Sequence, residues 1–248
     1  MNDIESYLGK NVKIIIDRPL GSAHPKFPSL IYPVNYGYIP ETIGGDGEEI
    51  DVYLLGVDEP VMEYTAKIIG IIYRADDAEQ KLVAAPEGTV MHQGEIAEAV
   101  YFQEKYFKTE IDGLYQKSCG AVVYREKSGV REYLCLRQAR SGSYSVPKGH
   151  MEAFETERQT AEREAREEAG IELSFIDGFR REMRYTVFET RKKTLVLFLA
   201  ECRGTVKYDG REISEHRWLS LEEAKKCLPN DYATILDEAE RYALESKI

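Results

Sequence analysis

A glutamate-rich stretch across residues 149–171 constrains the fold more than any other part of the sequence. It predicts a polar helix over residues 155–169 that stops at Gly170, where a left-handed C-terminal cap is expected. Three of its glutamates are spaced i, i+3 and i+4 and would share one helical face: Glu164, Glu167 and Glu168. Such a face either lies in solvent or serves a ligand that attracts negative charge.

A solvated face is the usual meaning of a glutamate-rich helix, and i,i+4 ion pairs would support it. Two pairs are available, Arg158 with Glu162 and Arg163 with Glu167, each worth ~0.3 kcal/mol. Carboxylates ~5.5 Å apart, however, repel by about 3 kcal/mol at an effective dielectric of ~20, and one arginine cannot neutralise three of them. A divalent cation does so better, and hard oxygen ligands favour Mg²⁺ or Mn²⁺.

The loop before this helix gives a second reason to expect a ligand. Pro147-Lys148-Gly149-His150 places a glycine where the backbone can pass close to another group, with a cation beside it. The Lys148 side chain could pair with phosphate, and its backbone carbonyl could be a metal ligand. The alternative for this loop alone is an ordinary Pro-Gly turn.

Loop and helix together resemble the signature of the Nudix hydrolases, G-x5-E-x7-R-E-U-x-E-E-x-G-U with U apolar. Seven fixed letters at ~7% each give chance odds on the order of 10⁻⁸ per start position. The resemblance covers about residues 117–248. It implies an α/β/α fold that hydrolyses a nucleoside diphosphate linked to another moiety. It also implies that Mg²⁺ or Mn²⁺ polarises the phosphoryl oxygens and activates a water, whose proton a carboxylate takes.

The resemblance implies a role for each position of the signature. The metal-binding and catalytic glutamates would be Glu164, Glu167 and Glu168. Arg163 would orient them through salt bridges, and Glu155 would brace the loop. Family members often use one more glutamate about six residues before a tryptophan. That spacing from Trp218 gives Glu212, with Glu215 as the second candidate and a plain surface acid as the alternative.

Two runs, residues 144–150 and 215–224, resemble the diadenosine tetraphosphate hydrolase branch of this family. That branch splits a dinucleoside polyphosphate asymmetrically into two nucleotides, although Pro-Lys-Gly also occurs in Nudix enzymes that act on capped RNA. The expected phosphate contacts are Arg137, Lys148, His150 and Lys193. The expected base-stacking aromatics are Tyr144, Phe154 and Tyr185. Core packing is the alternative for the aromatics, and solvated charges or loop hydrogen bonds for the others.

Position 154 departs from the family. Glycine is common there, and this chain has Phe154. The loop is therefore expected either to follow a different path or to present an aromatic ring to a base.

Charge is distributed unevenly along the chain. Of 33 basic and 44 acidic residues, 9 and 20 lie in residues 1–112, which leaves 24 of each in the remainder. This break predicts two units that meet near residues 112–117, and the acidic surface argues against DNA as a partner. The apolar runs are too short to span a membrane, and the acidic N-terminus argues against a signal peptide. Four cysteines without C-x-x-C spacing indicate a reduced, cytoplasmic protein.

The acidic first unit carries two motifs of its own. Residues 32–40 read Tyr-Pro-Val-Asn-Tyr-Gly-Tyr-Ile-Pro, and residues 46–51 read Asp-Gly-Glu-Glu-Ile-Asp. A turn could bring the acids of the second motif to one metal ion: Asp46, Glu48 and Asp51. A plain acidic turn is the alternative for this segment alone.

These two motifs together resemble the soluble inorganic pyrophosphatases, whose barrel carries Y-P-x-N-Y-G and a D-G-D-x-x-D metal motif. By position, Asp46 and Asp51 match the outer aspartates and Glu48 replaces the middle one, while Tyr36 and Lys81 match a phosphate-side tyrosine and a family lysine. A second acidic cluster is only loosely in register: Asp76, Asp77 and Glu79. The unit either hydrolyses inorganic pyrophosphate or is a weakened, non-catalytic binding module.

The pattern of elements predicts two domains and leaves the oligomeric state open. In residues 1–112, β-rich runs and a helix at 94–107 predict a small β-barrel, a pyrophosphatase-like α+β domain. Strands are expected there at residues 12–16, 52–55, 64–72 and 82–84. In residues 117–248, strands interleaved with helices predict an α/β/α Nudix sandwich. The connector is expected at residues 112–117. The substrate is expected to be a nucleotide polyphosphate, either a dinucleoside polyphosphate or a nucleoside triphosphate.

Overall fold

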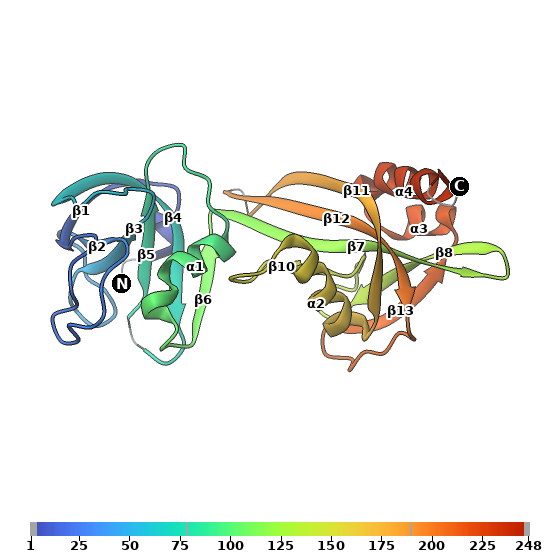
Figure 1. The fold of residues 1–248 in the computed structure, drawn as a ribbon, viewed down its shortest axis with the longest axis horizontal. Coiled ribbons are helices and arrows are strands. Elements are labelled where there is room, and N and C mark those ends of the chain that lie inside the picture. The colour runs from blue at the N-terminus through green and yellow to red at the C-terminus, as the bar shows by residue number, and fades with distance from the viewer. Residues whose placement is uncertain (1–3, 78, 189, 246–248) are drawn as a thin grey trace. The chain divides into compact units, whose positions relative to one another are not determined.

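The computed structural model describes residues 4–77, 79–188 and 190–245, and it divides the chain into two compact units (Figure 1). Unit 1 comprises Met1–Gln116 with two short segments from later in the chain, Glu152–Phe154 and Tyr185–Lys193. Unit 2 comprises the remaining segments: Lys117–Met151, Glu155–Arg184 and Thr194–Ile248. The predicted domain ranges, 1–112 and 117–248, would instead assign both of these short segments to the second domain.

Unit 1 is a closed five-stranded barrel with one further strand, which confirms the predicted small β-barrel. Its strands are β1 (Asn11–Arg18), β2 (Asn35–Ile39), β3 (Ile50–Leu54), β4 (Glu63–Arg74), β5 (Lys81–Ala85) and β6 (Thr109–Gly113). Their order is β1-β2-β3-β5-β4-β6, and the pairing of β1 with β4 closes the first five strands into the barrel. The barrel has an aliphatic core that includes Ile14, Val52 and Ile68.

The helix α1 (Gln93–Glu104) packs on a second core of unit 1, which is rich in tyrosine. Its buried Ile96 and Val100 lie in one cluster with Tyr32, Tyr36 and Tyr53. A short 3₁₀ turn, Ile4–Tyr7, precedes β1. The tyrosine hydroxyls place hydrogen-bond donors in an otherwise apolar interior, and those of Tyr36 and Tyr53 donate to Asp51 and Glu104.

The sequence did not predict two strands of unit 1, β2 and β6, because the first looks like a turn and the second is polar. β2 lies inside the Tyr-Pro-x-Asn-Tyr-Gly motif, where Gly37 is required by packing: a Cβ there would lie 1.9 Å from the carbonyl oxygen of Ile15 on β1. β6 is a polar run paired with β4. Within the predicted connector, residues 112–117, β6 ends at Gly113 and β7 begins at Tyr115, and unit 2 begins at Lys117.

Unit 2 is built around a sheet in the order β11-β12-β7-β8-β13. Its strands are β7 (Tyr115–Lys127), β8 (Val130–Gln138), β9 (Tyr144–Ser145), β10 (Lys148–His150), β11 (Glu172–Val187), β12 (Arg191–Arg203) and β13 (Ile213–Leu219). Its helices are α2 (Glu157–Ala169), α3 (Leu221–Cys227) and α4 (Ala233–Glu245), with a 3₁₀ turn at Asn230–Tyr232. The short strand β10 pairs with β7, and β9 pairs with β8.

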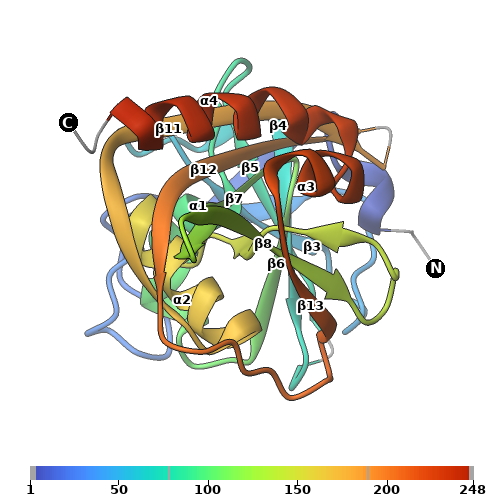
Figure 2. The same cartoon turned by 90° about the vertical axis from the view of Figure 1, so that its right-hand side faces the viewer.

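Helices cover both faces of this sheet, which confirms the predicted α/β/α sandwich. Figure 2 shows α2 on one side and α3 with α4 on the other. Three alanines of α2 face one core of the sheet: Ala161, Ala165 and Ala169. On the opposite face, Ala224 of α3 and Leu236 of α4 pack against Leu197. Small residues on α2 allow the helix to lie close to the sheet and hold its glutamates at a fixed height above it.

The ends of α2 are set by local sequence. Thr156 is the N-cap and accepts a hydrogen bond from the Gln159 N–H, and Gly170 ends the helix with φ 63°, as predicted. The helix thus begins two residues later than expected. Glu155 is left in the preceding loop, where its carboxylate can turn toward the helix.

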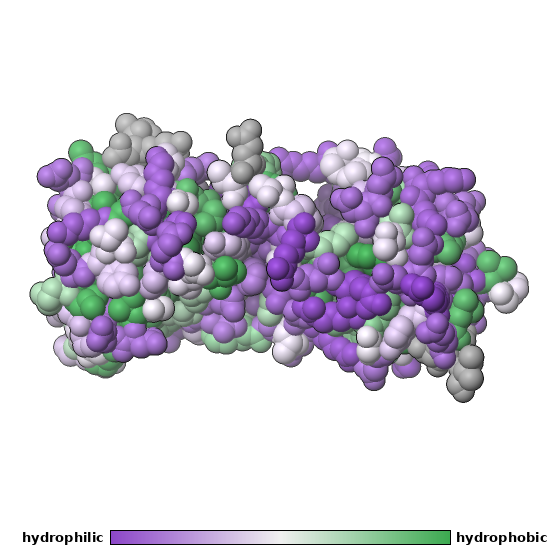
Figure 3. Space-filling model, turned by 90° about the horizontal axis from the view of Figure 1, so that it is seen from above, coloured by the Kyte–Doolittle hydropathy of each residue, from purple (hydrophilic) through white to green (hydrophobic). Residues whose placement is uncertain are grey.

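Hydrophilic side chains cover most of the face drawn in Figure 3, and the hydrophobic residues on it are scattered. In the described part of the chain, no helix is long and apolar enough to cross a membrane.

Candidate functional site

The loop glycine of unit 2 lies directly against a glutamate of α2. Gly149 is on β10 opposite Cys119 of β7, and a Cβ at this position would lie 2.0 Å from Oε1 of Glu164. Any side chain at residue 149 would therefore displace the carboxylate. The close backbone approach expected from the sequence is present, and its neighbour is a candidate metal ligand.

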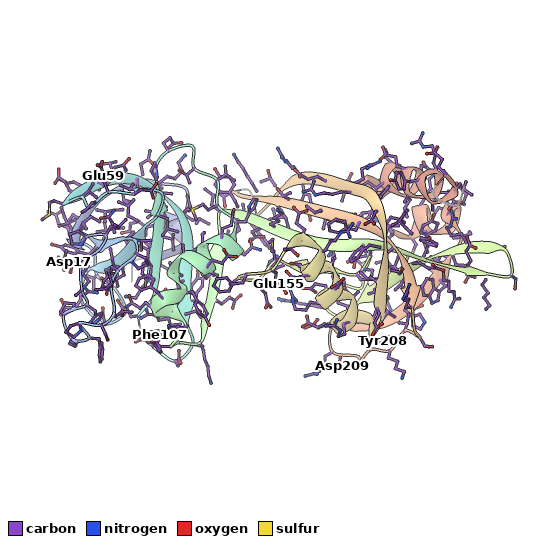
Figure 4. The ribbon with its side chains drawn as sticks, viewed as in Figure 1. Asp17, Glu59, Phe107, Glu155, Tyr208 and Asp209 are labelled. Carbon is purple, nitrogen blue, oxygen red and sulfur yellow. The ribbon has the colours of Figure 1, made fainter. Side chains whose placement is uncertain are left out.

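Arg163 is the centre of an ion-pair network that holds the loop and the helix together. Its Nε and Nη2 donate to both oxygens of Glu155, at 2.7 and 3.0 Å, and Nη1 donates to Glu164 at 2.7 Å and to Glu167 at 3.0 Å. Nη2 also donates to the carbonyl of His150 at 2.8 Å. Glu155, which lies just before α2 (Figure 4), thus ties the loop to the helix.

The other ion pair expected for a solvated helix is absent from the described contacts. Arg158 pairs with Asp177 at 2.7 Å, not with Glu162. The basic residues of α2 therefore neutralise its glutamates unevenly. Arg163 is shared among three carboxylates, and this leaves excess negative charge on the face that carries them.

Glu168 is the most buried of the three signature glutamates, with 6% of its surface exposed. Its described hydrogen bonds come from neutral groups, the Gln138 amide at 3.2 Å and the Lys148 backbone N–H at 3.1 Å. Burial raises the pKa of Glu168 to about 7 and also raises that of Glu164. Both carboxylates are thus held where their negative charge is poorly compensated.

A cleft of about 450 Å³ opens beside these glutamates. It is lined by Glu167, Glu168, Tyr208, Asp209, Arg211, Glu212 and Ile213. Tyr208 and Asp209 lie next to each other on the loop between β12 and β13 (Figure 4). Sequence reasoning missed Tyr208, Asp209 and Arg211 because this loop has no periodic pattern; their closeness to Glu212 in the chain was the one available signal.

The cleft distinguishes the two candidates for the additional glutamate. Glu212 lines this cleft. The pKa of Glu164 is raised first by burial, then by the charge of Glu167 and then by the charge of Glu212. Glu215 instead accepts hydrogen bonds from the Tyr144 hydroxyl at 2.9 Å and from Arg217 at 2.6 Å. The geometry therefore favours Glu212 over Glu215.

The donor set of this site fits a hard divalent cation. Its side-chain oxygens come from Glu164, Glu167, Glu168 and Glu212, and carboxylate oxygens suit Mg²⁺ or Mn²⁺. Among the described residues, no three acidic, histidine or cysteine side chains are close enough to complete a metal site as they stand. Arg163 holds two of these carboxylates, so a cation would compete with one of its N–H groups for their oxygens.

The predicted substrate contacts have different surroundings. Arg137 is exposed and donates from Nε to the carbonyl of Gly142 at 3.2 Å. Tyr144 has the Arg217 guanidinium over its ring at 5.0 Å, so one ring face is covered. Tyr185 and Lys193 lie in the segment that belongs to unit 1, outside the residues that line the cleft. His150 is exposed and contributes its carbonyl to Arg163.

Phe154 adopts the backbone conformation that glycine favours. Its φ is 63°, which costs an L-residue about 1 to 2 kcal/mol. Phe154 is therefore accommodated at the cost of local backbone strain. Its side chain is 62% exposed.

The predicted metal ligands of unit 1 are engaged with protein groups. Asp51 accepts hydrogen bonds from the Tyr36 hydroxyl and from Nζ of Lys81. Asp46 accepts one from the Glu48 N–H at 3.1 Å in an exposed turn. Tyr36 and Lys81, both predicted from the pyrophosphatase motif, are buried beside Asp51. The two signature motifs of this unit meet in the hydrogen bond from Tyr36 to Asp51, and Lys81 donates to both residues.

Family comparisons agree with both units. Residues 114–239 match the family model described as NUDIX domain, and residues 3–112 match the one described as Inorganic pyrophosphatase. The first match spans half of the chain, so the chain belongs to the Nudix family. Its N-terminal unit is a pyrophosphatase-like domain.

The most similar relatives of unit 2 belong to one branch of that family. Bis(5'-nucleosyl)-tetraphosphatase (asymmetrical) of Sus scrofa is 36% identical over 143 residues, which are 51% of this chain and 94% of the relative. The Mus musculus protein of the same name is 39% identical, over 44% of this chain and 81% of the relative. A crystal structure of a C. elegans Ap4A hydrolase binary complex has 26% identity and a TM-score of 0.50, and covers 52% of this chain and 98% of that one.

Unit 1 matches its relatives over a smaller share of their length. Inorganic pyrophosphatase of Saccharolobus solfataricus is 36% identical over 96 residues, which are 34% of this chain and 52% of the relative. The chain thus spans about half the length of that pyrophosphatase.

Proposed function

We propose that unit 2 hydrolyses a pyrophosphate bond in a dinucleoside polyphosphate, with diadenosine tetraphosphate as the leading substrate. The observation that carries the proposal is a pair of carboxylates on one face of α2 beside the loop. Half-buried Glu164 lies against Gly149, and buried Glu168 lines the 450 Å³ cleft. The likeness to the tetraphosphatases, which extends over nearly their whole length, supports this class of substrate.

The side chains of the site would have three tasks: to hold divalent cations, to position the glutamates and the loop, and to bind the polyphosphate. The oxygens of Glu164, Glu167, Glu168 and Glu212 would hold one or more divalent cations. A bound Mg²⁺ or Mn²⁺ supplies electrostatic stabilisation of the charge that develops on the phosphoryl oxygens. Arg163 fixes the positions of two of these glutamates, and its bonds to Glu155 and His150 fix the loop. Preorganised ligands of this kind avoid a reorganisation cost during the reaction.

Basic groups near the cleft would bind the polyphosphate. Lys148 directly precedes Gly149 in the loop, and Arg211 lines the cleft. Arg137 and His150 would contact more distant phosphates, and the backbone carbonyl of Lys148 would add a metal ligand. These assignments, like those of Tyr144, Tyr185 and Lys193, are predictions that substitutions can test one by one.

Two other substrate classes remain alternatives. A nucleoside triphosphate would need the same cations but only one base site. Inorganic pyrophosphate is a candidate for unit 1 through its family match, and a non-catalytic role is the competing interpretation of that unit. The predicted cytoplasmic location is supported by the four free cysteine thiols.

The test uses the full chain with Mg²⁺ and diadenosine tetraphosphate. We expect two different nucleotides as products, and Glu167→Gln to abolish turnover because it removes a ligand oxygen's charge. Glu162→Gln, an exposed change on the same helix, is the matched control and should keep full activity. Full turnover by Glu167→Gln would exclude the mechanism, and faster turnover of a nucleoside triphosphate would replace the substrate.

A further inference from the structure

Unit 1 has the fold and motifs of a pyrophosphatase, but four of its acidic side chains are already paired with Arg74 or Lys81. Hydrolysis of a phosphoanhydride by metals requires carboxylates that are available to divalent ions, typically two or more ions ~4 Å apart. The relevant question for unit 1 is therefore which of its carboxylates have negative charge left to offer.

Arg74 neutralises three carboxylates at the end of β4. Its side chain is 2% exposed, and Nε and Nη2 donate to the two oxygens of Glu104 at 2.9 and 2.6 Å. Nη1 donates to Asp77 at 3.2 Å and to Glu79 at 3.1 Å. The guanidinium also stacks on Phe107, which follows α1 (Figure 4), with 3.8 Å to the ring centroid. This cation is held by four partners and cannot move aside without leaving Glu104 buried and unpaired.

Lys81 takes up the remaining oxygens. It begins β5, its side chain is 2% exposed, and Nζ donates to Asp51 and Glu79, each at 2.6 Å. The third donor goes to the Tyr36 hydroxyl, which itself donates to Asp51. All three hydrogens of the ammonium group are thus used within the cluster. Lys81 thus gathers the oxygens of Asp51 and Glu79, although burial still raises the pKa of Glu79 to about 7.

The two cations also oppose a metal ion by charge. A divalent ion that shared Asp51 with Lys81 would lie within about 5 Å of Nζ and would be repelled by its charge. Of the acids in the two predicted clusters, Asp76 accepts the backbone N–H of Lys108 at 2.9 Å, which leaves Asp46 and Glu48 of the exposed turn. The first of these already accepts the backbone N–H of the second. They do not replace the buried oxygens that Arg74 and Lys81 hold.

We propose that Arg74 and Lys81 stand in for divalent cations in unit 1, so that this unit is a metal-independent module that does not hydrolyse inorganic pyrophosphate. The pyrophosphatase fold is retained, and the positive charge that holds its acidic residues together is built into the chain. All turnover by the protein then belongs to unit 2.

The first test measures phosphate released from pyrophosphate by the full chain carrying Glu168→Gln, so that unit 2 does not contribute. With Mg²⁺ or Mn²⁺ we expect the rate of the buffer alone. Phosphate release above that rate that is abolished by Asp51→Asn would overturn the proposal. Failure of the proposed function of unit 2 would show separately, as absence of diadenosine tetraphosphate turnover by the unsubstituted chain.

The second test reads metal binding directly, by the electron paramagnetic resonance of Mn²⁺ with the full chain carrying Glu164→Gln and Glu168→Gln. We expect no Mn²⁺ site that depends on Asp51. Adding Lys81→Gln should raise Mn²⁺ affinity at least tenfold, and Asp51→Asn should remove the gain. Lys81→Met, which keeps an unbranched side chain but removes the charge, is the second variant if Lys81→Gln does not fold. An Asp51-dependent Mn²⁺ site with Lys81 intact, or no gain in either folded variant, would contradict the proposal.

Discussion

The two units each gather acidic side chains, but they neutralise them differently. In unit 1, two buried cations, Arg74 and Lys81, bond to Asp51, Asp77, Glu79 and Glu104. In unit 2, Arg163 bonds to Glu155, Glu164 and Glu167, and the described bonds of buried Glu168 come from neutral groups. Acidic residues in a phosphate-processing fold are therefore not by themselves a metal site.

The two units differ in which groups compensate the negative charge of their carboxylates. A buried ion pair contributes little net stability, yet removing one partner leaves an uncompensated charge. The cations of unit 1 are therefore structural. In unit 2 the described bonds of Glu168 come from neutral groups, so this buried carboxylate can gain its compensation from a ligand. Four substitutions, ordered from the largest expected effect to the smallest, test this comparison.

Glu168→Gln should have the largest effect on activity. Loss of a metal ligand removes several kcal/mol of transition-state stabilisation, so we expect kcat for diadenosine tetraphosphate to fall by about 10³ or more. The corresponding change in unit 1, Glu79→Gln, should leave kcat unchanged. Steady-state rates of both variants decide the matter, and a Glu168→Gln enzyme within tenfold of the unsubstituted chain would contradict the role given to unit 2.

Arg74→Met should have the largest effect on stability. It leaves Glu104 buried beside Tyr53, whose hydroxyl donates to it at 2.5 Å, and a broken buried pair costs about 3 to 5 kcal/mol. Calorimetry should show a lower transition for unit 1. Lys13→Met, which removes an exposed pair with Glu63, is the control and should change little. An Arg74→Met protein as stable as the control would mean that this cation is not structural.

Gly149→Ala should lower kcat by about 10². The added methyl would lie 2.0 Å from Oε1 of Glu164, and displacement of a catalytic group by ~1 Å has an effect of this size. Ser143→Ala, exposed in the preceding loop, is the control. Since the steric conflict is with a side chain, the melting temperature should change much less than the rate. Unchanged kcat would show that the position of Glu164 is not critical.

Glu157→Gln should have the smallest effect, and one that depends on pH. Hydrogen bonds from Arg180, followed by Lys117, lower the pKa of Glu157 from 4.5 to about 2. A carboxyl with a lower pKa in the folded state stabilises the fold above its unfolded pKa, and this is lost as the pH falls through 2. Allowing for partial solvent exposure, we expect a cost of about 1 to 2 kcal/mol at pH 7.

Urea unfolding at pH 7 and at low pH measures that cost. The difference between Glu157→Gln and the unsubstituted chain should shrink steadily below pH 4.5. A cost that stayed constant down to pH 2 would show that the side chain acts through packing and not through its charge.

Local sequence was enough to predict α2 and its glutamates, because the spacing i, i+3, i+4 and the terminal Gly170 are contained within one helix. The partners of those glutamates were predicted less well. Arg158 pairs with Asp177 on β11, and Tyr208 and Arg211 reach the cleft from an irregular loop. Such contacts depend on how distant segments pack, which periodicity does not report.

The same limit applies more strongly to unit 1. Its strands and motifs were recognisable, but the bond between Arg74 and Glu104 joins residues thirty positions apart, and Lys81 reaches Asp51 across the β3–β5 pair. The sequence showed that the second acidic cluster was altered. That a buried arginine and lysine neutralise it could be seen only in the fold.

The most direct measurement follows two substrates in one preparation with Mg²⁺: diadenosine tetraphosphate, with products identified by mass, and inorganic pyrophosphate, with phosphate counted. We predict equal amounts of a nucleoside monophosphate and a nucleoside triphosphate from the first, lost in Glu168→Gln, and no phosphate from the second. Turnover of either substrate that survives Glu168→Gln and disappears with Asp51→Asn would contradict the account.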